Sequence, residues 1–197
     1  MSGVPLSVQK LTKRFEAGTV NEKLALDGLS LEVPAGQFVT VLGSNGSGKS
    51  TLFNAILGKV LPDSGKILLG EEDITRQKDY RRALNIGCLY QNPLRGTAPS
   101  MTIEENLALA YTRKASRSFF AVNHRDKITT PMITHDMDYA LSMGSRTVML
   151  SGGRVVLDLS GPERQTTTAG MLAERFYTRP RKRVEAEITS EKNENSL

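Results

Sequence analysis

This 197-residue sequence has only one cysteine and no long apolar stretch, and each of these features argues against a class of protein. The single cysteine, Cys88, has no partner for an internal disulfide, and its apolar neighbours predict a small core residue. No segment approaches the roughly 18 consecutive apolar residues that a membrane-spanning helix needs. Residues 1–5 lack the basic and apolar parts of a signal peptide, so we expect a cytoplasmic chain.

Aromatic residues are few and the excess of basic over acidic residues is small, which argues against nucleic acid as a partner. Aromatics make up 6% of the residues, and 26 Lys and Arg against 21 Asp and Glu give a net charge of +5. The densest basic cluster, Arg179–Arg183, falls in a charged segment that is poor in apolar residues. We therefore predict one domain over residues 1–178, followed by a disordered tail over residues 179–197.

One stretch carries a pattern of defined chemistry, the phosphate-binding loop G-x-x-x-x-G-K-[ST], which is matched at every fixed position. It consists of Gly43, Ser44, Asn45, Gly46, Ser47, Gly48, Lys49 and Ser50, followed by Thr51. Glycines allow a tight turn that brings backbone N–H groups close to phosphate oxygens. In such a loop the Lys49 ammonium would reach the β- and γ-phosphates of a nucleotide, and the Ser50 hydroxyl would bind Mg²⁺.

The residues on either side of this loop predict the setting that the pattern requires. Residues 37–42 are a short apolar run with β-branched side chains, which predicts a buried strand. Residues 51–57 predict a helix that ends near Gly58, and the first N–H groups of this helix would favour an anion. Strand, glycine loop and helix together predict an α/β protein with a P-loop nucleotide-binding fold.

On these residues the sequence resembles the ATP-binding subunits of ABC transporters. Residues 26–36 are similar to the family's run into its phosphate loop, residues 89–93 (LYQNP) resemble its Q-loop, and residues 133–136 (ITHD) resemble its switch-histidine motif. The resemblance implies that Phe15 stacks on adenine and that His135 contacts the γ-phosphate. It also implies that Gln91 reaches Mg²⁺ and senses a membrane partner.

The same resemblance implies an architecture, two cofactors and two partners. The expected fold is the P-loop core with an antiparallel β subdomain, and the expected cofactors are ATP and Mg²⁺. The expected partners are a transmembrane permease and a second ATP-binding subunit, with the chain on the cytoplasmic face of the membrane. In this family two subunits sandwich two ATP molecules, each between one phosphate loop and the other subunit's signature, and hydrolysis drives transport. The overall pattern is closest to importers of the amino-acid type.

The sequence departs from the family between the Q-loop and the switch histidine. Only 43 residues separate Gln91 from His135, and they contain neither the Leu-Ser-Gly-Gly-Gln signature nor the Walker B strand with its Asp and Glu. We expect an internal shortening near residues 127 and 128, with the helical subdomain largely deleted. Residues 150–154 (LSGGR) look like a signature, but they lie between two predicted strands, and we interpret them as a hairpin turn.

The shortening has predicted consequences for both chemistry and folding. ATP hydrolysis is expected to be slow, because loss of a general base costs about 10²–10⁴ in rate. The central sheet is expected to lose the Walker B strand, which the family places beside the strand before the phosphate loop. Residues 128–134 predict a strand that could fill this place, but Pro131 lacks an N–H and fits a central strand badly.

Other interpretations stay open beside an ATP-hydrolysing transporter subunit. The chain could be an inactive nucleotide-binding module that docks on a permease through residues 91–112. It could also be a decayed product with no function of its own. A nucleic-acid binder is a further alternative, although the phosphate loop already accounts for anion binding, and such a binder would have to hold DNA in a salt-dependent way.

Overall fold

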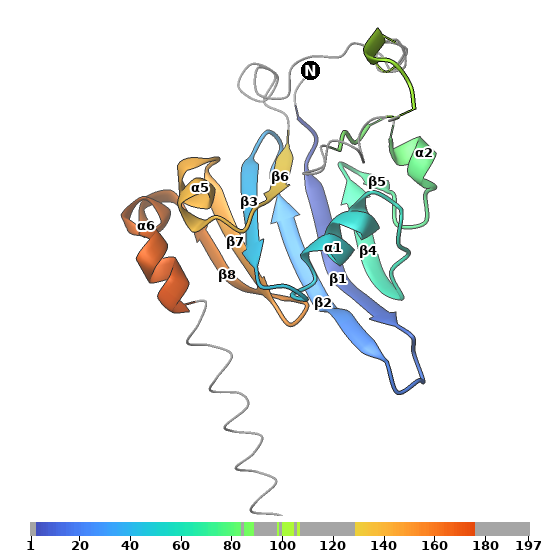
Figure 1. Ribbon diagram of the computed structural model, residues 1–197, viewed down its shortest axis with the longest axis horizontal. Helices are drawn as coiled ribbons and strands as arrows, with labels where there is room; N and C mark the ends of the chain where they lie inside the picture. Colours follow the sequence, from blue (N-terminus) through green and yellow to red (C-terminus); the bar gives the residue numbers. More distant parts are fainter. Residues whose placement is uncertain are drawn as a thin grey trace, which may run out of the picture.

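The computed structural model describes residues 3–83, 85–88, 98, 100–104, 106 and 129–175 of the chain. These residues form two four-stranded sheets with short helices packed against them (Figure 1). The antiparallel sheet has the strand order β2-β1-β4-β5, and its strands are Lys23–Val33, Leu6–Phe15, Ser64–Leu69 and Glu72–Asp73. The other sheet has the order β6-β3-β7-β8, and its strands are Thr130–Ile133, Phe38–Gly43, Arg146–Ser151 and Arg154–Ser160. The predicted α/β class with an antiparallel β part is therefore confirmed.

The helices of the described residues are short. Helices α1, α2, α5 and α6 span Lys49–Ile56, Asp79–Arg82, Met137–Ser142 and Gly161–Thr166, and residues 169–175 are helical as well. The helix predicted after the phosphate loop is thus confirmed as α1. None of the described helices is long and apolar enough to cross a membrane.

The main apolar core lies between the two sheets and includes one face of α1. Leu52, Ala55 and Ile56 of α1 are buried together with apolar side chains of β1, β2, β3, β4 and β7. A smaller cluster on the other face of the β3 sheet joins Leu42 to side chains from α5, β7, β8 and the last helical segment. Strand β3 is therefore covered on both faces, which explains why its sequence is a nearly continuous apolar run.

Strand β3 pairs with a strand on each side, so the place expected to be left empty by the missing Walker B strand is filled. It pairs in parallel with β6, where Val39 lies opposite Pro131, and in parallel with β7, where Val39 lies opposite Arg146. The N–H groups of Thr130 and Thr134 donate to β3 and its flanking residue, at 2.9 and 3.3 Å. The N–H groups of successive residues in a strand point to opposite sides, and that of Thr130 points to β3. The nitrogen of Pro131 therefore faces away from β3, where no N–H is needed for this pairing.

Two further outcomes concern single sequence features. Residues 151–154 form the turn of an antiparallel hairpin between β7 and β8, with Ser151 opposite Arg154, so the predicted hairpin is confirmed. The prediction that Cys88 is a small core residue is wrong, because its side chain is exposed. An apolar run of this length cannot by itself distinguish a buried strand from a surface segment.

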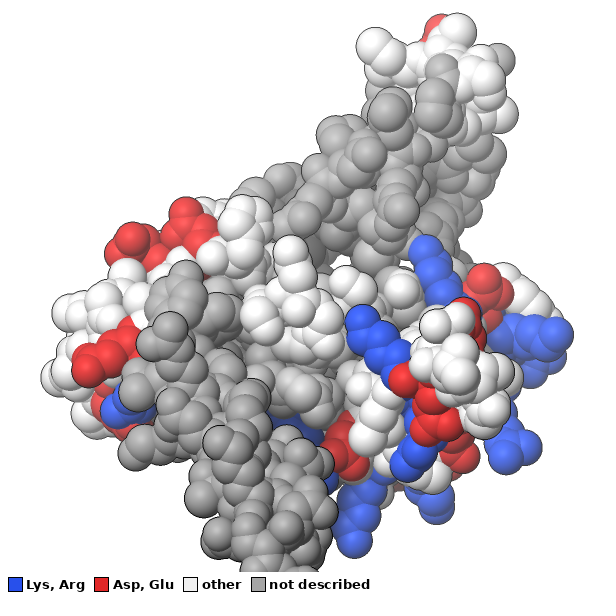
Figure 2. All heavy atoms as spheres, turned by 60° about the horizontal axis from the view of Figure 1, so that its bottom comes forward, with Lys and Arg blue, Asp and Glu red and all other residues white. Residues whose placement is uncertain are grey.

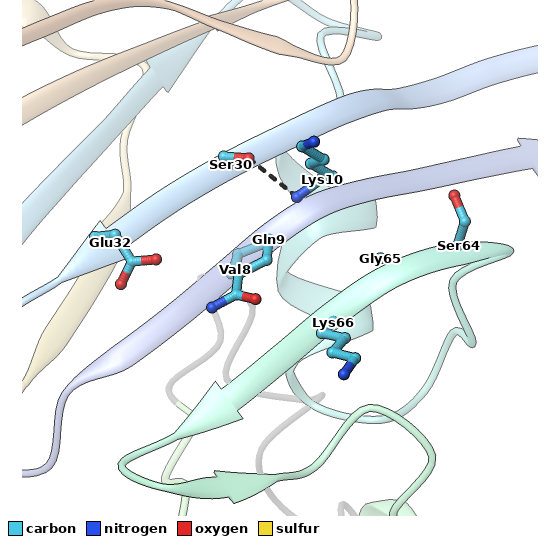
Figure 3. A pocket seen from close by; sticks show the side chains of 8 residues that line it. All are labelled: Val8, Gln9, Lys10, Ser30, Glu32, Ser64, Gly65 and Lys66. Carbon is cyan, nitrogen blue, oxygen red and sulfur yellow. Dashed lines mark hydrogen bonds between the residues drawn. The ribbon is translucent and has the colours of Figure 1, made fainter.

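The outer face of the antiparallel sheet carries a hollow of about 670 Å³ that is lined by residues of β1, β2 and β4 (Figure 3). Lys10, Lys66 and Glu32 are among the residues at its surface. Strand β1 is irregular here, since its register with β2 shifts between Val8 and Leu11. None of the residues predicted to bind a nucleotide lines this hollow, so we take the face as a reference surface for control substitutions.

Candidate nucleotide-binding site

The phosphate loop connects the end of β3 to the start of α1, as the sequence predicted. Gly48 caps α1 with a left-handed backbone, at φ 101°, and no side chain caps the helix. A methyl group on Gly48 would lie 2.5 Å from the carbonyl oxygen of Ala25 in β2. Glycine is therefore required at this position both by the backbone angle and by the close approach of β2.

The start of α1 is suited to an anion. Its first turn carries no acidic side chain and receives no side-chain cap. The first N–H groups of a helix have no partners within the helix, and together with the positive end of its dipole they attract phosphate. Gly48 and Ser47 are buried, whereas Ser50 is exposed at the helix start.

Lys49 lies folded back into the loop that it follows. Its ammonium donates to the carbonyl oxygens of Gly43 at 2.6 Å and Ser44 at 2.8 Å, and to Ser47 Oγ at 3.4 Å. Partial burial lowers the pKa of Lys49 below its usual value. The three partners of the Lys49 ammonium are uncharged, and a phosphate bound in the loop would give it a negatively charged partner. The geometry therefore fits the predicted role.

The residues predicted to bind Mg²⁺ are only partly described. The Ser50 hydroxyl is accessible, and Mg²⁺ prefers such oxygen ligands together with water and substrate phosphates. Gln91, the second predicted ligand, lies outside the described residues. Within the described ranges no group of three His, Cys, Asp or Glu residues could hold a metal. Of the two predicted ligands, the Ser50 hydroxyl is therefore the one that the structure describes, and its exposure at the start of α1 fits contact with an ion.

His135 emerges at the same end of the sheet as the phosphate loop. Strands β6 and β3 run in parallel, and Ile133 of β6 lies opposite Val41 of β3. His135 comes two residues after Ile133, and Gly43, the last residue of β3, comes two residues after Val41. Both residues therefore lie at the same end of the sheet. The next residue, Asp136, accepts a hydrogen bond from the Tyr139 N–H at 2.8 Å and caps α5. His135 itself is exposed, and α5 fixes the backbone beside it. Its predicted role toward the γ-phosphate stays a prediction.

Phe15 lies at the end of β1 and keeps 38% of its surface exposed, as a base-stacking side chain would need. Its partner across the β1–β2 pair is Lys23. The Lys13 ammonium lies 5.6 Å from the centre of the Phe15 ring.

Lys23 also lies close to the phosphate loop. No sequence motif contains this residue, because only the pairing of β1 with β2 brings it near the loop. A methyl group on Gly46 would lie 3.8 Å from the Lys23 Nζ.

The turn between β7 and β8 contacts the phosphate loop directly. The Gly153 N–H donates to the Ser47 carbonyl at 3.2 Å, and the Gly153 carbonyl accepts from the Asp27 N–H at 3.1 Å. Arg154 and Asp27 form an ion pair at 2.6 Å beside these bonds. The residues that resemble a signature thus support this chain's own phosphate loop from a hairpin, and they do not begin a helix.

The C-terminal end of α1 is held by a residue that motif reasoning also missed. The Arg82 side chain is 1% exposed and donates to carbonyl oxygens of Ala55 and Ile56, at 2.6 and 2.9 Å. Arginine at a helix C-terminus suits the negative end of the dipole. A buried arginine cannot be recognised from sequence, since this residue type is usually exposed.

Strand, glycine loop and helix define this site as that of a P-loop nucleotide-binding protein, and comparison with known proteins gives the family. The sequence matches the family described as ABC transporter over residues 26–156, which is most of the chain. The chain belongs to the ABC transporter family, and it has the fold of that family's ATP-binding subunits.

Curated relatives agree with this assignment. A tyrosine transport ATP-binding protein of Clostridioides difficile is 27% identical, with 87% of this chain and 98% of the relative covered. A sulfate/thiosulfate import ATP-binding protein of Chromobacterium violaceum is 36% identical over 76% of this chain, which spans only 37% of that relative. An energy-coupling factor transporter ATP-binding protein of Bacillus subtilis is 39% identical over 45% of this chain and 31% of its own length.

Solved structures show the same fold at low sequence identity. The protein cbiO1 from Clostridium perfringens, part of the ABC transporter complex cbiONQ, matches with a TM-score of 0.68 at 19% identity, covering 92% of this chain and 98% of that chain. The bacterial ABC transporter cassette MJ0796, solved as a dimer, matches with a TM-score of 0.65 at 19% identity, covering 79% and 98%. A further structure of MJ0796 contains ADP and phosphate. The curated relatives are named ATP-binding proteins, so ATP is the nucleotide of this family.

Proposed function

We propose that this chain is the ATP-binding subunit of an ABC transporter, in which ATP binding acts on a transmembrane permease, most simply for import. The observation that carries the proposal is the phosphate loop, with Lys49 held inside it and the uncapped start of α1 beside it. The name of the C. difficile relative, a tyrosine transport protein, supports a role in transport, and the name of the C. violaceum relative, a sulfate/thiosulfate import protein, supports import. In such an assembly the chain would lie on the cytoplasmic face of the membrane, beside a second ATP-binding subunit.

Each residue predicted to contact the phosphates or the ion has a defined task in the proposed site. Lys49 exchanges its bonds to loop carbonyls for bonds to the β- and γ-phosphates, and the N–H groups of the loop donate to the same oxygens. The Ser50 hydroxyl, with Gln91, would hold Mg²⁺, which neutralises phosphate charge when bound. His135 would donate to the γ-phosphate from the neighbouring strand end.

Hydrolysis by this chain is proposed to be slow, because its sequence lacks the carboxylates that hold the ion and polarise the attacking water. The alignment with the C. difficile relative is 246 positions long but covers only 87% of the 197 residues of this chain, so about 75 aligned positions of that relative have no counterpart here. This supports an internal shortening. We propose that it lies near residues 127 and 128, between the Q-loop and the switch histidine, within a domain of residues 1–178. Because this chain lacks a signature, it could not complete the ATP site that begins at the phosphate loop of a partner subunit.

A second candidate function follows from the same observation. A chain that binds ATP and does not turn it over would act as a nucleotide-dependent docking module, whose conformation depends on the bound nucleotide. Phosphate release by the purified chain, measured beside the binding experiment below, separates the two candidates. Release that disappears in Lys49→Ala supports an enzyme, and binding without release supports the module.

The proposed function is tested by equilibrium binding of Mg-ATP to the purified chain. Lys49→Ala is expected to lower the affinity by roughly 10- to 100-fold, because it removes a charge-assisted contact to two phosphates. Lys66→Ala is the matched control, since it removes a lysine from the outer face of the antiparallel sheet (Figure 3). Failure of the unaltered chain to bind, or equal binding by Lys49→Ala, would reject the proposal.

A separate substitution tests the predicted stacking residue. Phe15→Ala is expected to lower the affinity for ATP by roughly 5- to 150-fold, because base stacking on an aromatic ring is worth about 1–3 kcal/mol. The affinity for inorganic tripolyphosphate, which has no base, is expected to stay unchanged. Competition of both ligands against a fluorescent nucleotide measures the two affinities in one assay. An equal loss for both would instead mean that Phe15 supports the fold of the hairpin.

A further inference from the structure

The β1–β2 hairpin brings a second cation to the phosphate loop besides Lys49. Lys23 begins β2 and lies directly across from Phe15 at the end of β1. Side chains that lie opposite each other in an antiparallel pair project to the same face of the sheet. The position of a methyl group on Gly46 would be 3.8 Å from Lys23 Nζ, so this ammonium lies over the middle of the loop.

The two other cations at the turn end of this hairpin, Lys13 and Arg14, are already paired. Lys13 forms an ion pair with Asp63 at 2.7 Å, and Arg14 forms one with Glu22 at 2.6 Å. Over the face shown in Figure 2 basic and acidic side chains are likewise interleaved. Within the described ranges no carboxylate forms an ion pair with Lys23, although its neighbour Glu22 is acidic. Its charge therefore stays available to an anion that enters from outside.

The backbone around Lys23 is held in place. Glu22 accepts hydrogen bonds from the Gly18 N–H at 2.8 Å and from the Arg14 guanidinium, which closes the turn between the two strands. Two backbone bonds across the turn, from Thr19 to Glu16 and from Glu22 to Thr19, add to this closure at 3.1 Å each. An ammonium on such a support loses less conformational entropy on binding than one on an open loop.

We propose that Lys23 is a nucleotide-binding residue that contacts the α- and β-phosphates, between the base on Phe15 and the loop at Gly46. This inference rests on the proposed ATP-binding function and names a contact that no motif of the sequence contains. Lys49 acts from the far end of the loop on the β- and γ-phosphates. Lys23 acts on the phosphates near the ribose, so it adds affinity for ATP and ADP alike.

The test compares Lys23→Gln, Lys23→Arg and the unaltered chain for binding of ATP and ADP at two salt concentrations. Lys23→Gln is expected to lower both affinities by the same factor, roughly 3- to 10-fold at low salt. The loss should shrink at high salt, because an exposed charge is screened. Lys23→Arg should keep most of the affinity. Lys66→Gln, a lysine of the outer face, should bind like the unaltered chain.

The outcomes separate this inference from the function on which it rests. If the unaltered chain binds ATP and Lys49→Ala does not, but Lys23→Gln binds both nucleotides normally, the inference is overturned and the function stands. Absence of binding by the unaltered chain overturns both. Because Lys23 is exposed, the melting temperature of Lys23→Gln should match that of the unaltered chain. A lowered melting temperature together with a loss that salt does not change would assign Lys23 a structural role and reject the proposed contact.

Discussion

Replacement of Arg82 by alanine is expected to lower the free energy of unfolding by about 3–5 kcal/mol, because it leaves several buried carbonyl groups without a donor. The guanidinium of Arg82 donates to Ala55 and Ile56 at the end of α1, and also to Gln77 at 2.9 Å and Thr75 at 2.8 Å. One side chain thus joins the helix of the phosphate loop to the segment that follows β5.

The charge of Arg82 is stabilised by these carbonyl dipoles. Burial lowers the pKa of Arg82, and the charge of Asp73 partly offsets that effect. Within the described residues no carboxylate contacts the guanidinium, so the negative end of the α1 dipole has to balance most of its charge. Lysine cannot replace it, because a single ammonium does not span four carbonyl oxygens.

Urea denaturation measures this effect, with a midpoint shift of roughly 1–2 M expected for Arg82→Ala. Arg81→Ala is the matched control, because Arg81 belongs to the same helix and its side chain is exposed. An Arg82→Ala chain with an unchanged midpoint would show that water or rearrangement replaces the four bonds.

The sequence predicted the parts of this structure that depend on local pattern. The strand, loop and helix around Lys49 could be placed because each residue type there has a backbone or phosphate-binding reason. The hairpin at residues 151–154 could be placed because its glycines lie between two apolar runs. The strand at Thr130–Ile133 was also found, since its apolar residues outweigh the signal of one proline.

The parts that could not be predicted depend on which segments lie side by side in space. Pro131 looked unsuited to a central strand, but its nitrogen faces away from β3, and only the register of the pair reveals this. Lys23 joins the site through its pairing with Phe15, and Arg82 is buried through contacts to α1. None of these relations leaves a periodic signal in the sequence.

Replacement of Gly153 by alanine is expected to lower the affinity for Mg-ATP by at least about 10-fold, because it moves a support of the phosphate loop. A methyl group on Gly153 would lie 2.8 Å from the Ala25 carbonyl oxygen and 2.9 Å from Leu26 Cα. Both contacts are to the backbone of β2, which cannot turn away as a flexible side chain would. The turn must then shift, and with it the bond from Gly153 to the Ser47 carbonyl.

The preceding glycine provides a matched control for this effect. Gly152 and Gly153 both have positive φ, at 54° and 73°, so alanine at either position costs about 1–2 kcal/mol in backbone strain. A methyl group on Gly152, however, would meet no atom within 4 Å. Gly152→Ala should therefore lower the melting temperature modestly and leave the affinity for Mg-ATP unchanged. Equal losses of affinity in both variants would mean that strain in the turn, and not contact with β2, controls the phosphate loop.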